Sequence, residues 1–242
     1  MRIGALSDIG KNRNTNEDSY FVYRNQNLLG GMVADGMGGE NAGEIASSMA
    51  CDIIKEYIMN EFNPEMDYFQ LAEVIRRAFI EANDRIFAYS KKDKQLEGMG
   101  TTATLAIIYK GKLIVVHVGD SRVYLIDDEG IHRHTKDHSY VQELLSRGEI
   151  TREFAERHPA KNYITRAVGS EDILKADVTV SDYHGETVVI CSDGLSNMLS
   201  DNQIEDIIRE NDDLQFGAVE LVKLANKKGG LDNITVIVFS DN

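Results

Sequence analysis

Proline, tryptophan and sequence repetition are what this chain has least of. Only two prolines and no tryptophan occur in 242 residues, and no low-complexity tract, proline- or serine-rich linker or fixed-period repeat interrupts the sequence. Hydrophobic residues make up 42% of the chain, which excludes disorder over most of its length. We therefore expect a single globular domain over residues 1–242.

The chain also has few cysteines and no long apolar run. Cys51 and Cys191 lie far apart and neither has a C-x-x-C partner, so we expect no disulfide framework and no zinc knuckle, and interpret both as small core residues. The N-terminus lacks an apolar core with a small-residue cleavage site, and no apolar run approaches the roughly 20 residues of a membrane span. These absences favour a reducing cytoplasm.

Positive charge is scarce as well. The sequence has 26 Lys and Arg against 40 Asp and Glu, which gives a formal net charge of −14. Such an acidic surface repels the phosphate backbone that a nucleic-acid binder must neutralise. We expect a cytoplasmic monomer that binds neither nucleic acid nor a membrane.

Apolar residues spaced three and four apart predict four long helices. The first covers residues 42–58 and the second residues 68–86, with Pro64 marking the break between them. Two more helices are expected near the C-terminus, capped near Ser200 and Asp213. We expect the first two helices to pack side by side.

Alternating and β-branched residues predict strands. Residues 101–109 and 112–118 read as a hairpin around Lys110-Gly111, and residues 122–126 extend it as an antiparallel meander. Further strands are expected at residues 20–23, 28–34, 187–191 and 234–239. Because strands and helices come in blocks, we expect an α+β fold, a four-layer α/β/β/α sandwich of two mainly antiparallel sheets flanked by helix pairs.

Acidic residues at strand ends form the most informative pattern. Two apolar strands end in Asp-Gly, at Asp35 and Asp193, and Asp232 immediately precedes the last strand. Three other acids stand at comparable strand edges: Glu17, Asp18 and Asp120. Each alone is the usual residue of a turn or cap, but together they predict one shared site.

A cluster of that kind requires cations. Two carboxylates 4 Å apart repel by roughly 4 kcal/mol at an effective dielectric of 20, so several cannot stay ionised side by side without bound metal. Oxygen ligands without an adjacent His or Cys favour Mg²⁺ or Mn²⁺ over zinc. Gly36, which follows Asp35, lets a backbone carbonyl approach the metal with little steric cost.

Eight short motifs are spread over nearly the whole chain. In order they are residues 13–18 (RNTNED), 33–39 (VADGMGG), 100–102 (GTT), 118–122 (VGDSR), 137–139 (DHS), 164–169 (ITRAVG), 192–195 (SDGL) and 232–235 (DNIT). This series resembles the metal-dependent protein phosphatases of the type 2C (PPM) Ser/Thr family, in their compact bacterial form. The resemblance implies a β-sandwich flanked by helix pairs, with a dinuclear metal centre at one end.

The resemblance also assigns metal ligands. Asp35 would bridge two Mg²⁺ or Mn²⁺ ions, with the Gly36 carbonyl on the first ion and with Asp193 and Asp232 on the second. Asp120, together with Asp193, would hold a third, weaker ion.

The catalytic residues that the resemblance implies are Arg13, Glu17 and Asp18. Glu17 and Asp18 would act mainly through metal-bound waters. Arg13 corresponds to the phosphate-binding arginine of the family, whose planar fork suits two phosphoryl oxygens and which lysine should not replace.

One position departs from the family pattern. Many eukaryotic members have a histidine after Asp-Gly, proposed to protonate the leaving alkoxide, whereas this chain has Met37. A metal-bound water is then the preferred general acid, and His138 is a weaker candidate that could equally be a buried structural histidine. We expect His132 and His134 to lie on a strand after the Gly130 turn and not to bind metal.

Residues 139–162 stand where the family has a flap subdomain beside the active site. The segment is rich in charged residues: Glu143, Arg147, Glu149, Arg152, Glu153, Glu156 and Arg157. A solvated helical face is the plain interpretation, and substrate recognition is the functional one.

The resemblance therefore implies hydrolysis of phosphoserine and phosphothreonine in proteins by a metal-activated water, opposing a bacterial Ser/Thr kinase. The partners would be phosphorylated proteins that are substrates of the kinase, and the kinase itself. One alternative is a catalytically silent phosphoprotein-binding sensor, which the presence of Asp35, Asp193 and Asp232 disfavours. The other is a phosphatase dedicated to one regulatory protein of the anti-sigma antagonist type, which commonly carries sensor or membrane segments that this sequence does not show.

Overall fold

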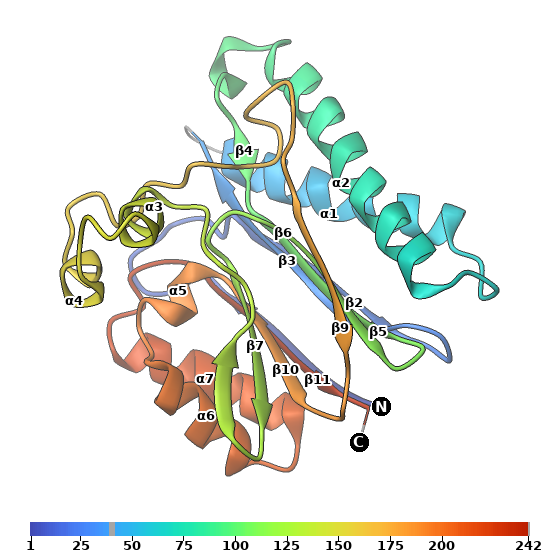
Figure 1. Cartoon of the computed structure of the whole chain (residues 1–242). Coiled ribbons are helices and arrows are strands. Elements are labelled where there is room, and N and C mark those ends of the chain that lie inside the picture. Colours follow the sequence, from blue (N-terminus) through green and yellow to red (C-terminus); the bar gives the residue numbers. More distant parts are fainter. Residues whose placement is uncertain (39–41, 242) are drawn as a thin grey trace.

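Two stacked β-sheets form the centre of the molecule, and a pair of helices covers the outer face of each (Figure 1). The computed structural model describes residues 1–38 and 42–241, so Gly39 of the VADGMGG motif lies outside the described residues, as does the side chain of Glu156. Helices α1 (Ala42–Glu61) and α2 (Tyr68–Ser90) cover one sheet, and α6 (Asp201–Arg209) and α7 (Leu214–Lys227) cover the other. The expected four-layer α+β sandwich is confirmed.

Each sheet is antiparallel at every strand pair in the described residues. The first sheet contains, in spatial order, β2 (Asp18–Arg24), β3 (Leu29–Met37), β5 (Ala103–Tyr109), β6 (Lys112–Val118) and β9 (Asp177–Asp182), and the short β4 (Gly100–Thr101) pairs with β3. The second sheet contains β1 (Arg2–Asp8), β11 (Ile234–Ser240), β10 (Thr187–Cys191), β7 (Arg122–Asp127) and β8 (Gly130–Arg133).

Apolar side chains fill three layers, one between the sheets and one under each helix pair. Successive residues of a strand point to opposite faces of its sheet. In β3, Val33 therefore packs between the sheets while Met32 packs under α1 and α2. In β7, Val123 packs between the sheets while Tyr124 packs against the α6–α7 side. Because the central strands are buried on both faces, their sequences are almost continuously apolar.

Local capping sets the helix boundaries. The Asp67 side chain accepts from the Gln70 N–H at 2.8 Å, and the Gln70 side chain accepts from the Asp67 N–H at 2.9 Å, which starts α2 with a capping box. The expected caps at Ser200 and Asp213 are confirmed for α6 and α7. No helix in the described segments combines the length and the apolar character that a bilayer crossing needs.

The predicted meander is wrong at its third strand. The β5–β6 hairpin forms, but β7 lies in the other sheet, between β10 and β8. The chain crosses over at Gly119, whose φ of +111° lies in the left-handed region, and a Cβ there would come within 2.5 Å of the Thr102 side chain. The reason is burial, because β7 is apolar on both faces and suits a sheet interior, whereas the largely exposed β9 takes the edge beside β6.

Several short or exposed elements carry too weak a pattern to be predicted. These are β1, β9, the 3₁₀ turn at Lys94–Leu96 and the short α5 (Asp193–Ser196). The expected helical stretch after Ser139 is confirmed as α3 (Tyr140–Ser146) and α4 (Arg152–Glu156), which stand off one end of the sandwich near α5 (Figure 1). His132 lies on β8 as expected, and His134 follows just after its end.

Candidate metal centre

Asp18 and Asp35 are paired across β2 and β3 at the end of the first sheet. The Gly36 N–H donates to the Glu17 carbonyl at 3.1 Å, which places Glu17 beside the same strand end. A Cβ on Gly36 would lie 2.1 Å from the Gly43 carbonyl oxygen, so the start of α1 packs against a position that only glycine fits. Three of the predicted acids are thus brought together by one strand pair.

The end of β10 brings Asp193 to the same place. The Ser192 hydroxyl donates to Asp18 Oδ2 at 2.8 Å and accepts from the Thr235 N–H at 2.9 Å, which ties the second sheet to the first. Burial, the charge of Asp18 and the charge of Asp193 all raise the pKa of Asp35, as expected for carboxyls that lie close together. The two Asp-Gly strand ends therefore meet at the same end of the sandwich.

Asp232 and Arg13 close the cluster from opposite ends of the chain. Arg13 Nη2 lies 2.8 Å from Asp232 Oδ2, and both side chains are partly exposed. The next residue, Asn233, accepts from the Glu17 N–H at 2.8 Å and donates from Nδ2 to two carbonyls of the N-terminal loop. Asn233 therefore fixes the segment that carries Arg13 and Glu17 against the start of β11.

Asp120 lies in the crossing between the sheets. The backbone N–H of Gly119 donates to the ring nitrogen Nδ1 of His138 at 3.1 Å. The backbone N–H of His138 donates in return to the Gly119 carbonyl at 2.7 Å. On the other side, Gly119 packs on Thr102, whose hydroxyl accepts from the Asp35 N–H at 2.9 Å. These contacts hold the Asp120 loop against the end of β3.

Crowding and burial change the acidity of the cluster. Burial raises the pKa of Asp18 to about 7, and the charges of Asp193 and Asp232 add to the effect. Burial, followed by the charge of Asp232, raises the pKa of Asp193 to about 6. Burial and neighbouring carboxylates hold the pKa of Asp35 and the pKa of Asp120 well above the ordinary value. Near neutral pH the metal-free cluster therefore keeps protons that a cation would displace.

The donor set fits a hard divalent cation. Asp18 Oδ1 is buried and has no hydrogen-bond partner, an arrangement that costs free energy unless a cation satisfies it. Every acidic donor offers oxygen, which suits Mg²⁺ or Mn²⁺. Within the described residues, no three His, Cys, Asp or Glu side chains are arranged so that they could hold a metal ion without rearrangement. Arg13 Nη2 lies 2.8 Å from Asp232 Oδ2, and this contact would have to open for that oxygen to bind a cation.

The histidines stand outside this cluster. His138 is 6% exposed, and its Nε2 lies 3.1 Å from Asp177 Oδ2 and 3.2 Å from an Arg166 nitrogen, while its Nδ1 accepts from Gly119. Both ring nitrogens are engaged, so the structural interpretation of His138 is the one that the geometry favours. His132 lies 3.4 Å from Asp127 at the β7–β8 turn and takes no part in the cluster.

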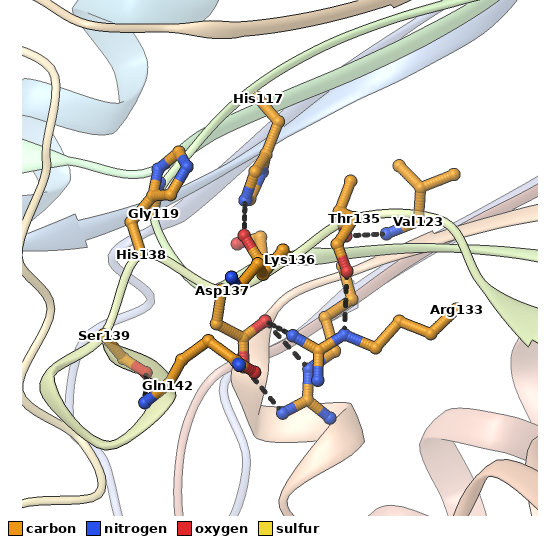
Figure 2. A network of polar contacts seen from close by, with 12 residues as sticks. His117, Gly119, Val123, Arg133, Thr135, Lys136, Asp137, His138, Ser139 and Gln142 are labelled. Atoms are coloured by element: carbon orange, nitrogen blue, oxygen red, sulfur yellow. Dashed lines mark hydrogen bonds and ion pairs between the residues drawn. The ribbon is translucent and has the colours of Figure 1, made fainter. Parts of the chain in front are cut away.

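Two residues beside the cluster were missed by sequence reasoning. Asp137 accepts from Arg122 Nε at 3.2 Å and from Arg122 Nη2 at 2.9 Å, and it forms an ion pair with Arg133 (Figure 2). Asn197 Nδ2 donates to Asp193 Oδ2 at 3.0 Å from one helical turn further on. The only signal for Asp137 was its place in the DHS motif, and Asn197 had none beyond its spacing from Asp193.

Comparison with known proteins shows that the chain is similar to phosphatases. Residues 10–220 match the sequence model of a family described as Protein phosphatase 2C. The Serine/threonine phosphatase stp of Listeria welshimeri is 38% identical over 244 residues, which cover 100% of this chain and 96% of the relative.

Two solved structures have the same fold. The Mycobacterium tuberculosis serine/threonine phosphatase PstP/Ppp matches with a TM-score of 0.86 at 36% identity, covering 98% of this chain and 97% of that one. A catalytic domain of the serine threonine protein phosphatase PstP in complex with 2 manganese ions matches with a TM-score of 0.84 at 35% identity, covering 98% of this chain and 96% of that one.

Proposed function

Because the chain belongs to the protein phosphatase 2C family, we propose that its acid cluster binds the divalent cations with which it hydrolyses phosphoserine and phosphothreonine in proteins. The enzyme is a metal-dependent protein-serine/threonine phosphatase, and its substrates are phosphorylated proteins. The observation that carries the proposal is the meeting of Asp18, Asp35 and Asp193 from three strand ends, with one Asp18 oxygen left unpaired.

We assign the core ligands of two Mg²⁺ or Mn²⁺ ions to Asp35, the Gly36 carbonyl, Asp193 and Asp232. The pKa of Asp35 supports this assignment, because burial, the charge of Asp18 and the charge of Asp193 all raise it, as expected for carboxyls of one site. We assign Asp120 to a third, weaker ion together with Asp193. The charge of Asp193 is one of the causes that raise the pKa of Asp120, which is in accord with two neighbouring ligands.

When bound, two such cations lower the pKa of a water and offset charge on the phosphoryl oxygens. The chain's own groups bind and orient. Arg13 uses one nitrogen on Asp232, which leaves other N–H groups of its fork for two phosphoryl oxygens. Glu17 and Asp18 offer carboxylate oxygens to the waters of the site, and Glu17 is held in place through the bond from its N–H to Asn233.

The proton for the leaving alkoxide would come from a metal-bound water in this proposal. Met37 has no proton to give, and both nitrogens of His138 are engaged by Gly119, Asp177 and Arg166. A histidine in that arrangement orients the Asp120 loop rather than exchanging protons with substrate.

The domain organisation and the cellular setting are proposed from composition and sequence pattern. We propose that residues 1–242 act as one catalytic domain, with residues 139–162 as a flap subdomain that contributes to substrate recognition. We further propose a cytoplasmic monomer that opposes a Ser/Thr kinase, acting on substrates of that kinase and on the kinase itself. Cys51 and Cys191 are free and buried, which fits a reducing compartment, and the net charge of −14 disfavours nucleic acid and anionic membranes.

Neither alternative function is favoured. A catalytically silent sensor would be expected to lack a ligand, yet Asp35, Asp193 and Asp232 are all in the cluster. Nothing in the described residues marks the chain as dedicated to one regulatory protein.

The decisive measurement is phosphate release from a phosphothreonine peptide by the full chain with Mn²⁺, with and without excess chelator. We expect activity only when metal is available. Asp193→Asn should retain less than about a tenth of it, because the substitution removes a charged ligand, whereas Asp52→Asn on the exposed face of α1 should behave as wild type. Chelator-resistant release, or full activity in Asp193→Asn, would refute the proposal.

The third ion has its own test. Asp120→Ala should lower turnover and raise the Mn²⁺ concentration needed for half-maximal activity, while calorimetry still finds two tightly bound ions. Turnover that matches wild type at every Mn²⁺ concentration would remove Asp120 from the metal site.

A further inference from the structure

A cavity of about 1020 Å³ is lined mainly by residues of the flap helices α3 and α4 and of the α5–α6 segment. Its lining carries five cationic side chains: Arg122, Arg133, Lys136, Arg152 and Lys161. Only two of the described acidic side chains line it: Asp137 and Asp201. In a chain whose net charge is −14, the lining of this cavity therefore has the opposite sign.

The carboxylate of Asp137 is already paired with cationic side chains of the cavity lining. Arg122 donates two hydrogen bonds to it and Arg133 forms an ion pair with it, and Figure 2 shows the Asp137 carboxylate directed at the Arg133 guanidinium. Among the described side chains, the other three cations have neither an ion-pair nor a hydrogen-bond partner: Lys136, Arg152 and Lys161. The cavity thus presents positive charge that no described carboxylate of its own wall neutralises.

The cavity adjoins the acid cluster directly. Asn197 lines the cavity, and its Nδ2 donates to Asp193 Oδ2 at 3.0 Å. Arg122 lines it as well and follows Asp120 by two residues. Successive residues of an extended chain rise by about 3.3 Å each. One polypeptide can therefore place a phosphoryl group at the cluster and a nearby side chain in the cavity.

We propose that this cavity binds an anionic group of the substrate polypeptide, a carboxylate or a second phosphate, carried within a few residues of the phosphoserine or phosphothreonine. Lys136, Arg152 and Lys161 provide the positive charge that receives it. The inference rests on the proposed phosphatase function and adds to it a preference for acidic or multiply phosphorylated segments. The net charge of the protein repels such segments, so a cationic cavity beside the acid cluster favours the docking of an acidic substrate there.

The test compares phosphothreonine peptides that differ only in their flanking charge. The parent peptide has neutral flanks, a second series carries glutamates within four residues of the phosphothreonine, and a third carries a phosphonate analogue of phosphoserine, which has the charge without a hydrolysable ester. The quantity measured is kcat/KM with saturating Mn²⁺, expressed as the ratio to the parent peptide. Hydrolysis of p-nitrophenyl phosphate reports the acid cluster without any flanking residue.

For the wild-type enzyme we expect a ratio of roughly fivefold for at least one anionic series, the size of one partly exposed charged contact. The ratio should fall as salt is raised. The double substitution Lys136→Gln and Lys161→Gln should bring the ratio close to one. The matched double substitution Lys55→Gln and Lys94→Gln removes the same charge from exposed sites outside the cavity and should leave the ratio unchanged.

The possible outcomes distinguish failure of the cavity inference from failure of the proposed phosphatase function. A preference for the glutamate series identifies carboxylate as the ligand, and a preference confined to the phosphonate series identifies phosphate. Equal rates for all peptides, or a preference that survives the Lys136 and Lys161 substitutions, would overturn the cavity inference while leaving the phosphatase function intact. If neither p-nitrophenyl phosphate nor the parent peptide is hydrolysed, the proposed function fails and the cavity inference fails with it.

Discussion

Asp18 and Asp35 are cross-strand partners, paired in register at the point where β2 begins and β3 approaches its end. Side chains at such positions lie on the same face and about 5 Å apart at Cβ, and like charges there are destabilising. Burial, the charge of Asp18 and the charge of Asp193 all raise the pKa of Asp35, so the carboxylate form of this pair is disfavoured. This arrangement lowers the stability of the metal-free protein. The same closely spaced carboxyls are what allows the site to bind cations.

Asp35→Asn should separate stability from activity. Activity should drop below about a tenth of wild type because a charged ligand is lost. In excess chelator, however, the variant should melt about 2–4 °C higher than wild type, because the raised pKa of Asp35 means that folding disfavours its carboxylate, a penalty of about 1 kcal/mol or more that asparagine does not carry. The measurement is thermal unfolding with chelator and with Mn²⁺. A lower melting temperature in chelator would contradict the electrostatic account, and Asp52→Asn serves as the exposed control.

The metal-free protein should lose stability as pH rises from 6.5 to 8. The pKa of Asp18 is raised to about 7, and those of Asp35 and Asp120 lie well above the ordinary value, whereas the unfolded carboxyls are ionised throughout this range. The folded state therefore holds more protons than the unfolded state, and removing them costs folding free energy. Thermal unfolding in chelator across this range measures the slope, which Asp18→Asn should reduce.

The predicted pH range starts at 6.5 because below that pH a buried histidine contributes to the pH dependence of stability with the opposite sign. Burial lowers the pKa of His117 to about 4, so between about pH 4 and 6.5 the contribution of this histidine to stability rises with pH and opposes the falling contribution of the carboxyls. Saturating Mn²⁺ should invert the trend above pH 6.5, because cations bind the deprotonated carboxylates. A flat metal-free profile from 6.5 to 8 would show that the cluster does not retain its protons.

Arg13→Lys should weaken catalysis although charge is conserved. Lysine can still reach toward Asp232, but it offers a point charge where the guanidinium offers a planar fork to two phosphoryl oxygens. We expect kcat/KM to fall about tenfold for both a phosphopeptide and p-nitrophenyl phosphate, with Mn²⁺ affinity unchanged. Arg24→Lys, at an exposed position of β2, is the control. Wild-type kcat/KM in Arg13→Lys would exclude a bidentate phosphate contact.

Two glycine substitutions should differ strongly in their effect on stability. A Cβ on Gly194 would lie 2.0 Å from the Asn233 carbonyl oxygen, so Gly194→Ala must push the Asp193 segment away from the start of β11. We expect a loss of about 2 kcal/mol or more in stability, together with weaker metal binding. In Gly217→Ala the nearest atom is the end of the Ile208 side chain at 3.3 Å, and alanine favours the helix, so stability should change by less than about 1 kcal/mol. Chemical denaturation of both variants makes the comparison, and equal effects would contradict it.

Local features of the fold were predictable because they depend on neighbouring residues. The caps at Ser200 and Asp213 and the Lys110-Gly111 hairpin follow from side-chain chemistry and φ preferences over a few positions. β9 escaped prediction because its side chains are mostly exposed and carry no strong alternation. The same holds for Asn197, whose bond to Asp193 cannot be distinguished in sequence from an ordinary surface amide.

By itself the sequence determined the family, the four-layer fold class and the residue types of the site, since Asp-Gly strand ends and apolar periodicity are local patterns. Only the tertiary structure decided that β7 joins the second sheet, that the charge of Asp193 acts on Asp35, and that Lys136 and Lys161 line one cavity. The physical reason is that these features depend on packing and charge interactions between segments far apart in the chain. Their free energies are set by burial and distance in the folded molecule and have no counterpart in the order of the residues.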